Sequence, residues 1–370
     1  MIASSRKLCI SGIDRGRCFP DIQWAPGRSG HQNQNARGIK TPAETRGKKM
    51  KLHHIRDVSA VAETGSLRAA GRLLGITQPA ISRSIRDIEN DLGAPLFERH
   101  VNGVCLTPIG QAFLRRAEVI QSEMRRARDE VDQLKGNFVG QASMAMSSGA
   151  AIALTSRIVR SFRRKYPKAL LRMRQDFFQP VERSIKSGEI DFYLGAYDQA
   201  LSSTSLSVEH IADNQRVIIA RAGHPLGNAR SIGELRSAQW IRPSLANRPD
   251  ETAFEEIFVR AGLPRPDIVL HTTSTIMTIL AIADSDLLSF LPVQWLESPL
   301  IKSFVQAIPI ADVTFACPPL CIVRRSDLPL TPVAQHLYDL ARNAAMNYAM
   351  DRKVPAEPTA LQGCAAVLAE

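Results

Sequence analysis

The sequence predicts an α/β multidomain chain with an N-terminal winged helix-turn-helix, a long coiled-coil linker helix and a C-terminal bilobal α/β domain. Two short amphipathic segments lie on either side of the tight turn "LLGIT", which predicts the helix-turn-helix. A longer segment then repeats apolar residues every three or four positions for almost four heptads, which predicts the linker helix. Beyond residue 140, short apolar strands alternate with helical segments, and this alternation is typical of an α/β fold.

Length and composition are those of an ordinary globular protein. The 370 residues suffice for two or three domains with separate cores. No apolar run approaches the ~20 residues that span a bilayer, and early arginines rule out a secretory signal. The six cysteines include no C-x-x-C pair, so we predict no metal site and no cofactor. We expect a reduced, cytoplasmic protein that does not bind membranes.

Most of the formal net charge of +11 lies at the N-terminus, where residues 1–49 hold ten Lys and Arg against three Asp and Glu. This segment lacks periodicity, which predicts a disordered basic extension. Two interpretations stay open. Translation starts at Met50, as the sudden onset of patterning there favours, or the extension adds non-specific attraction to nucleic acid. The bulk charge is therefore no evidence of DNA binding.

The first two helices of the predicted DNA-binding domain, residues 50–107, have clear ends. Apolar residues at helical spacing begin at Leu52, and Gly65 closes that helix. Ser66 is a good N-cap for a second helix over Leu67–Leu74.

The third helix has two different faces. Thr77 is its predicted cap, and a proline is tolerated in its first turn. At about 100° per residue, one narrow arc must face the core, and it holds Ile81, Ile85, Ile88 and Leu92. The other side holds Gln78, Pro79, Ser82, Arg83, Arg86 and Asn90. Gln and Arg side chains can bond the edges of adenine and guanine, and a proline ring can contact a thymine methyl. As the second helix of a helix-turn-helix, it is predicted to read bases rather than to form a merely solvated face.

The stretch "PLFERHVNGVCLTPIG" predicts a wing. Two short apolar runs flank Asn102 and Gly103, which is a hairpin turn signal. Arg99, His100 and Asn102 are then placed to touch phosphate or the minor groove, contacts that position a domain on DNA.

The linker helix, predicted over residues 108–136, begins at the cap Thr107. A sustained seam of this kind needs a partner, so we predict dimerisation, with two third helices reading the half-sites of an imperfect palindrome. A rigid spacer is the alternative. The seam consists of Ile109, Phe113, Ala117, Ile120, Met124, Ala127, Val131 and Leu134.

Residues 140–348 are predicted to form two lobes with parallel α/β sheets, joined by two crossover strands as in periplasmic binding proteins. We place lobe one at 141–211 and 315–348, lobe two at 212–314, and a flexible tail at 349–370. The predicted helices span about 152–166, 181–188, 231–236, 251–261, 274–283 and 332–345.

Ligands of such sheets bind beyond the carboxyl ends of strands, where helix N-termini favour an anion, commonly a carboxylate. The alternative for each hydroxyl there is a simple helix cap. We expect at least two candidates to converge on one cleft. The candidate effector-binding residues are Ser147, Ser148, Phe177, Gly195, Arg242, Ser244, Thr272 and Thr273.

Residues 51–110 closely resemble the LysR-type transcriptional regulators of bacteria, in "GSLRAAGRLLGITQPAISRSIRDIENDLGAPLFERHVNGVCLTPIG" and the long helix after it. The resemblance continues more weakly to about residue 345. It implies a homotetramer that bends promoter DNA and binds an effector through Ser and Thr side chains. A departure is "IADSDLLSFLP", which lacks the glycines common before "LP" and puts the usual cleft shape in doubt. The helix pattern and the resemblance together predict as DNA-binding residues Ser66, Thr77, Gln78, Pro79, Ser82, Arg83, Arg86 and Arg99, of which Arg86 rests on the helix pattern alone.

Three classes of function are open to a chain of this kind. The first is a sequence-specific transcriptional regulator controlled by a small, anionic metabolite between the lobes, with double-stranded promoter DNA, further copies of itself and RNA polymerase as partners. The second is an enzyme, but the chain has no G-x-S-x-G elbow, Walker loop or G-x-G-x-x-G after a strand, so we predict no catalytic residue. The third is an architectural protein whose sequence-independent, salt-dependent binding is lost on deleting residues 1–49.

Overall fold

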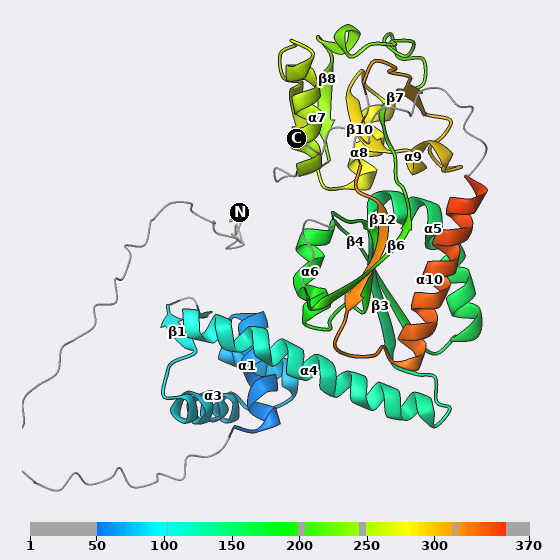
Figure 1. The fold of residues 1–370 in the computed structure, drawn as a ribbon. Helices are drawn as coiled ribbons and strands as arrows, with labels where there is room; N and C mark the ends of the chain where they lie inside the picture. Colours follow the sequence, from blue (N-terminus) through cyan, green and yellow to red (C-terminus); the bar gives the residue numbers. More distant parts are fainter. Residues whose placement is uncertain are drawn as a thin grey trace, which may run out of the picture. The chain divides into compact units, whose positions relative to one another are not determined.

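The structure is a computed structural model of the chain, and its elements are drawn in Figure 1. The predicted extension at 1–49 lies outside the described residues, as do Asn102, Ser244 and most of the predicted tail. The described residues are 50–101, 103–198, 204–243, 249–313, 315 and 317–352, with the backbone alone for 249–253.

The N-terminal domain forms a winged helix-turn-helix, as predicted. Gly65 and Gly75 take the left-handed conformation, with φ of 64° and 66°, and they close the first two helices where the sequence predicts. Ser66 caps the second helix, since its hydroxyl accepts a hydrogen bond from the Ala69 N–H at 3.4 Å. Thr77 holds the N-cap position, but its side chain makes no capping bond, contrary to the prediction. The elements are α1 (Leu52–Thr64), α2 (Leu67–Leu74), α3 (Gln78–Leu92), β1 (Phe97–His100) and β2 (Gly103–Leu106).

The core of this domain lies under α3. Ile81 and Ile88 are fully buried and Ile85 nearly so, packed against Val58, Val61 and other apolar residues of the three helices. Leu92 was predicted to belong to this core but is 41% exposed. It is the last residue of α3, where the chain turns away at the capping glycine Gly93.

The linker helix α4 (Pro108–Leu134) starts at Thr107, whose hydroxyl accepts a bond from the Gly110 N–H and donates one to Pro95 O. Its predicted seam is divided between two environments. Phe113 packs on the core of the winged domain, and Ala117 is buried. Met124 is half-buried, and the other large seam residues are exposed, namely Ile109, Ile120, Val131 and Leu134.

Lobe one is a five-stranded sheet in the order β4-β3-β5-β12-β6. β3 runs parallel to β4 and β5, whereas β12 runs antiparallel to β5 and β6. Helices α5 and α10 pack on one face and α6 on the other (Figure 1). The bounds are β3 (Gln141–Met146), α5 (Ser148–Lys165), β4 (Leu170–Gln175), α6 (Phe178–Lys186), β5 (Phe192–Ala196), β6 (Leu206–Ala212), β12 (Leu320–Arg325) and α10 (Pro332–Asp351).

Lobe two is a second five-stranded sheet, in the order β11-β7-β10-β8-β9. β8 is parallel to β9 and β10, while β7 is antiparallel to β10 and β11. Its core is aromatic, with Trp240, Phe254, Phe258 and Phe290 packed together. The bounds are β7 (Arg216–Arg221), η2 (Ile232–Leu235), β8 (Gln239–Arg242), α7 (Pro249–Arg260), β9 (Asp267–His271), α8 (Thr275–Ala283), β10 (Leu288–Pro292), α9 (Gln294–Glu297) and β11 (Val305–Ile308).

The bilobal α/β prediction is confirmed, but each sheet is mixed, with the predicted parallel strands joined by antiparallel ones. The chain crosses between the lobes after β6 and again before β12, and strands next to these crossings run against their neighbours. Three helix predictions also need correction. The segment at 231–236 is only the short 3-10 helix η2, and α5 starts at Ser148, directly after its cap Ser147. α10 continues to Asp351, into the predicted tail, and within the added turn the partly buried Tyr348 packs against the lobe-one core.

Candidate nucleic-acid interface and interlobe pocket

One face of α3 is held by the core and the other is open. Gln78, Pro79, Arg83 and Arg86 are exposed, and Ser82 is half-buried. The Arg86 Nε donates to Ser82 O at 3.1 Å, so this side chain lies along its own helix. The Arg83 guanidinium makes no hydrogen bond or ion pair with any other described residue. Of the two arginines, Arg83 is therefore the better placed to contact an external group.

Two acidic residues of α3 are occupied by local bonds. Glu89 Oε1 accepts the backbone N–H groups of Leu96 and Phe97, at 2.8 and 3.2 Å. Asp91 accepts the backbone N–H of Met50 at 3.0 Å. These carboxylates fix the turn into the wing and the start of the domain.

The helix-turn-helix brings several predicted residues to one surface. A groove beside α1 is lined by Thr77, Pro79 and Arg83, together with His53 and Arg56, which the sequence analysis did not single out. The N-termini of α2 and α3, with their orphan backbone N–H groups, are suited to a phosphate. Ser66 lies at the first of these termini, and Arg99 is exposed on the wing.

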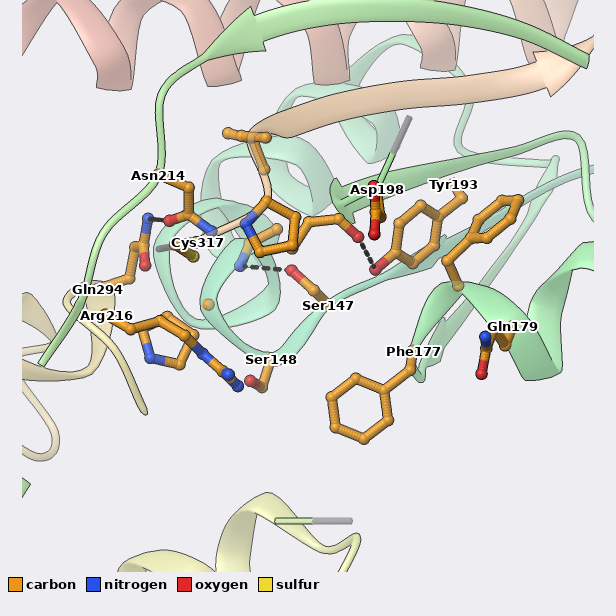
Figure 2. Close-up of a pocket in the computed structure, with 17 residues that line it drawn as sticks. Ser147, Ser148, Phe177, Gln179, Tyr193, Asp198, Asn214, Arg216, Gln294 and Cys317 are labelled. Atoms are coloured by element: carbon orange, nitrogen blue, oxygen red, sulfur yellow. Dashed lines mark hydrogen bonds between the residues drawn. The ribbon is translucent and has the colours of Figure 1, made fainter. Parts of the chain in front are cut away.

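A second candidate site is a cavity of about 70 Å³ lined by residues of both lobes (Figure 2). Since one water needs about 10–15 Å³ of such space, the cavity has room for a small metabolite. Its polar lining side chains are Ser147, Ser148, Gln179, Tyr193, Asp198, Asn214, Arg216, Gln294 and Cys317.

The N-terminus of α5 forms one wall of this pocket. The Ser147 hydroxyl accepts a bond from the Ala150 N–H at 3.5 Å, and Ser148 is the first residue of the helix. This 18-residue helix directs its positive end and unpaired N–H groups at the pocket. The wall is therefore suited to an anion.

The only cation among the described lining residues, Arg216, comes from lobe two. It begins β7, is 8% exposed, and its guanidinium lies over the Phe290 ring, 5.0 Å from the ring centroid. Figure 2 shows its side chain reaching toward Ser148. A helix N-terminus and a guanidinium, one from each lobe, thus converge on one space.

Two amides complete this side of the pocket. Gln294 is 6% exposed, and its Nε2 donates to Asn214 Oδ1 at 3.1 Å. The Oε1 atom of Gln294 is buried and has no hydrogen-bond partner. A buried acceptor without a hydrogen bond costs free energy. The protein alone therefore leaves one polar atom of this pocket, the Gln294 Oε1, without a hydrogen bond.

The structure places three of the predicted effector residues on this pocket, namely Ser147, Ser148 and Phe177. Gly195 lies directly behind the lining, where an added Cβ would lie 2.3 Å from Tyr193 Oη and 2.7 Å from Ser147 Cβ. Glycine there leaves room for both side chains.

Three further candidates, Arg242, Thr272 and Thr273 of lobe two, are not among the lining residues of the pocket. Arg242 forms an ion pair with Glu255 inside lobe two. Thr272 is buried and accepts a bond from the Ser274 N–H, which is a local turn contact, and Thr273 is exposed. Ser244 lies outside the described residues.

Sequence reasoning missed Tyr193, Asn214, Arg216 and Gln294. Asn214 and Arg216 flank the start of β7, after the first crossing, and Gln294 begins the short helix α9. The one local signal was an arginine at the start of a strand that reads as fully apolar, "RVIIA".

The described residues contain no group of three or more His, Cys, Asp or Glu side chains that could hold a metal. None of the described helices has the length and apolar content that crossing a bilayer requires. Cys105 and Cys321 are free thiols. Burial raises the pKa of the Cys321 thiol to about 11, so this cysteine stays protonated and unreactive near neutral pH.

Both the winged helix-turn-helix domain and the bilobal domain match known protein families. Residues 52–111 match the family described as bacterial regulatory helix-turn-helix protein, lysR family. Residues 135–346 match the LysR substrate binding domain. The regulator TdcA of Escherichia coli is 27% identical over 262 residues, which are 71% of this chain and 83% of TdcA. The regulator GbpR of Azospirillum brasilense is 26% identical over 241 residues, 64% of this chain and 70% of GbpR.

Two solved structures have the same fold. The LysR family regulator CbnR has a TM-score of 0.60 at 19% identity, covering 80% of this chain and 99% of CbnR. Full-length CbnR in complex with its target DNA has a TM-score of 0.59 at 20% identity, covering 80% of this chain and all of that one. Together with the two family matches, this fold shows that the chain belongs to the LysR-type transcriptional regulators, DNA-binding proteins with an effector-binding domain and no enzymatic activity.

Proposed function

We propose that this regulator binds promoter DNA through the exposed face of α3 and changes that binding when a small anionic metabolite occupies the interlobe pocket. The observation that carries the proposal is the division of α3 into a buried isoleucine face and an open face with Gln78, Pro79 and Arg83. A helix held in this way can enter the major groove without rearrangement of the domain.

On this proposal, Gln78 and Arg83 bond base edges, and Ser82 and Pro79 add adaptable and apolar contacts. Arg86, whose guanidinium already bonds Ser82 O, makes a weaker contribution. Ser66, Thr77 and Arg99 contact phosphates, which set the register of the domain on the duplex. Arg56, in the groove beside Arg83, joins this group.

The effector of this proposal is an anion, commonly a carboxylate. Ser147, Ser148 and the first N–H groups of α5 bind it from lobe one, and Arg216 binds it from lobe two. Because these groups belong to different lobes, an anion between them favours one separation of the lobes over others. Phe177 supplies an apolar wall beside them.

The pocket is connected to the linker helix by buried polar contacts. Asp191, directly before β5, accepts bonds from the Ser143 N–H and hydroxyl at 2.7 and 2.8 Å and from Arg126 of α4 at 2.8 Å. β3 holds Ser143 and leads into Ser147 at the pocket. We therefore propose that a change at the pocket strands reaches α4 through Asp191 and Arg126.

Self-association follows from the same helix. The exposed seam residues Ile120, Val131 and Leu134 are 36, 50 and 74% exposed in the single chain. Burying them against a second copy removes apolar surface from water. The proposal is a dimer through α4, assembling further into a tetramer that presents two pairs of α3 helices.

A selection from sheared genomic DNA tests the proposal, with the full chain and the chain from Met50 in moderate salt. We expect a few promoter fragments that share an interrupted palindrome, recovered equally by both chains and lost with Arg83→Ala. The control Arg164→Ala, an exposed arginine of α5, should recover the same fragments as the wild type. Recovery without a shared sequence, unaffected by Arg83→Ala and dependent on residues 1–49, would instead support the architectural alternative.

A further inference from the structure

We propose that the effector is a small zwitterion of the amino-acid type. Its carboxylate faces the α5 N-terminus and Arg216, its ammonium bonds the Gln294 Oε1, and the Asp198 carboxylate on the other side of the pocket favours that positive charge. This inference rests on the proposed anion pocket and names the chemical class of its ligand. It follows from the acceptors that line the pocket beside its single arginine.

The orientation of the Gln294 amide is fixed by its neighbours. Asn214 Oδ1 accepts the backbone N–H of Gln215 at 3.0 Å, and a backbone N–H can only donate, so this atom must be the oxygen. The same oxygen lies 3.1 Å from Gln294, which must therefore present its NH₂ group to it. The Gln294 Oε1 is left as the buried acceptor without a partner.

That acceptor lies beside the anion-binding end of α5. A Cβ added to Gly149, in the first turn of α5, would lie 2.9 Å from Gln294 Oε1. A plain carboxylate bound at this turn would leave the oxygen unpaired and would be repelled by it. A ligand that carries a donor next to its carboxylate, as an α-amino acid does, can satisfy both groups at once.

The charges across the pocket fit the same ligand. Among the described lining residues, Arg216 is the one cation and Asp198 the one carboxylate. Figure 2 shows Asp198 beside Tyr193, on the other side of the pocket from Arg216. Both charges line the same pocket, so both act on a molecule bound there. The negative charge of Asp198 disfavours an anion without positive charge, and the ammonium of a zwitterion offsets that repulsion.

The size and shape of the pocket limit the amino-acid side chain. One water occupies about 10–15 Å³ of such space, and the cavity volume is about 70 Å³. The pocket therefore holds a molecule with few non-hydrogen atoms. The Phe177 ring projects into the same space in Figure 2 and offers an apolar surface. We expect a small or apolar side chain rather than a long charged one.

Binding of matched ligands to the full chain tests the inference. Each of the twenty standard L-amino acids is screened by thermal shift, and those that bind are measured by calorimetry beside the 2-hydroxy acid and the simple carboxylate of the same carbon skeleton. We expect the amino acid to bind about tenfold to a hundredfold more tightly than its hydroxy acid, as for hydrogen bonds to charged groups.

Two isosteric variants complete the test. Asp198→Asn should reduce the preference for the amino acid over the hydroxy acid by about tenfold. Asp213→Asn should leave it unchanged, because the Asp213 side chain is fully exposed and does not line this pocket.

The outcomes separate this inference from the proposed function. Equal binding of amino acids and hydroxy acids, unaffected by Asp198→Asn, overturns the zwitterion and leaves an anion pocket. Binding of simple carboxylates without any amino acid does the same. If neither class binds the wild-type chain, the proposed anion site fails together with the inference.

Discussion

The open face of α3 and the interlobe pocket are built in opposite ways. The side chains on α3 come from one short helix, point into solvent, and have few bonds inside the domain. The pocket side chains come from strand ends and helix starts throughout lobes one and two, and its key members, Arg216 and Gln294, are almost completely buried. The α3 surface is held in place by the isoleucine core beneath the helix. The pocket is held in place by contacts of its own side chains, such as Arg216 with Phe290 and Gln294 with Asn214.

On α3, therefore, different residues serve DNA recognition and folding stability. In the pocket, the same residues serve both ligand binding and stability. On α3, recognition residues are exposed and stability residues are the isoleucines on the other face. In the pocket, Arg216 packs on Phe290 of the lobe-two core, so a change of ligand contact is also a change of packing. Substitutions can test each side of this comparison.

The largest effect is expected beneath α3. Ile88→Ala removes a fully buried side chain from the winged domain and should lower its free energy of unfolding by about 2–5 kcal/mol. Leu92→Ala, on the same helix but 41% exposed, is the control and should cost much less. Urea unfolding monitored by circular dichroism measures both. If both substitutions lowered the free energy of unfolding equally, burial of the isoleucine face would not be what holds α3 in the domain.

Removing the charge of Arg216 should have the next largest effect. Arg216→Gln is expected to weaken binding of any anionic ligand of the pocket by about tenfold to a hundredfold, because a charge-assisted bond is lost. The control Arg236→Gln changes an exposed arginine of lobe two and should bind as the wild type does. Calorimetric titration with the ligand found in the screen decides, and unchanged affinity would remove Arg216 from the site.

A pair of threonines distinguishes a structural cap from a contact residue. Thr107→Ala loses two hydrogen bonds at the start of α4 and should cost about 1 kcal/mol of stability. Thr77→Ala loses no capping bond, so thermal unfolding should barely change while DNA affinity falls. A clear drop in stability with Thr77→Ala, together with unchanged DNA affinity, would reverse these two roles.

The smallest effect concerns pH and lobe one. Burial acts to raise the pKa of Glu209, but bonds from Tyr338 Oη at 2.6 Å and Arg342 outweigh it and lower that pKa below its usual value. Stability from this group is therefore present above the unfolded pKa of about 4.3 and is lost as pH falls through the folded pKa. Tyr338→Phe should be destabilising at pH 6, and the difference from wild type should shrink toward pH 3. A difference that is constant over this range would exclude the linkage.

The winged domain was predictable from the sequence element by element because its signals are local. Gly65, Gly75 and Ser66 mark helix ends within a few residues of the contacts they make. Leu92 was misplaced because periodicity does not say where the covering helices end. Thr77 shows that a good capping residue need not use its side chain.

The pocket could be predicted only on its lobe-one side. Ser147, Ser148 and Phe177 follow strands and start helices, which is a local pattern. Arg242, Thr272 and Thr273 follow the same pattern in lobe two, yet do not line the pocket. Arg216 reaches it because it follows the first crossing between the lobes, and Gln294 because β10 pairs with β7, so both depend on long-range strand pairing. The antiparallel strands beside those crossings were missed for the same reason.

The most direct test of base reading by α3 is the affinity of the wild type and of Arg83→Ala for one selected promoter fragment and for a scrambled fragment, over a series of salt concentrations. A base-reading arginine predicts that Arg83→Ala reduces the ratio of specific to non-specific affinity by about tenfold to a hundredfold, with the salt slope lowered by no more than about one unit. An unchanged ratio with a lower salt slope would contradict the account, because Arg83 would then contact only phosphate.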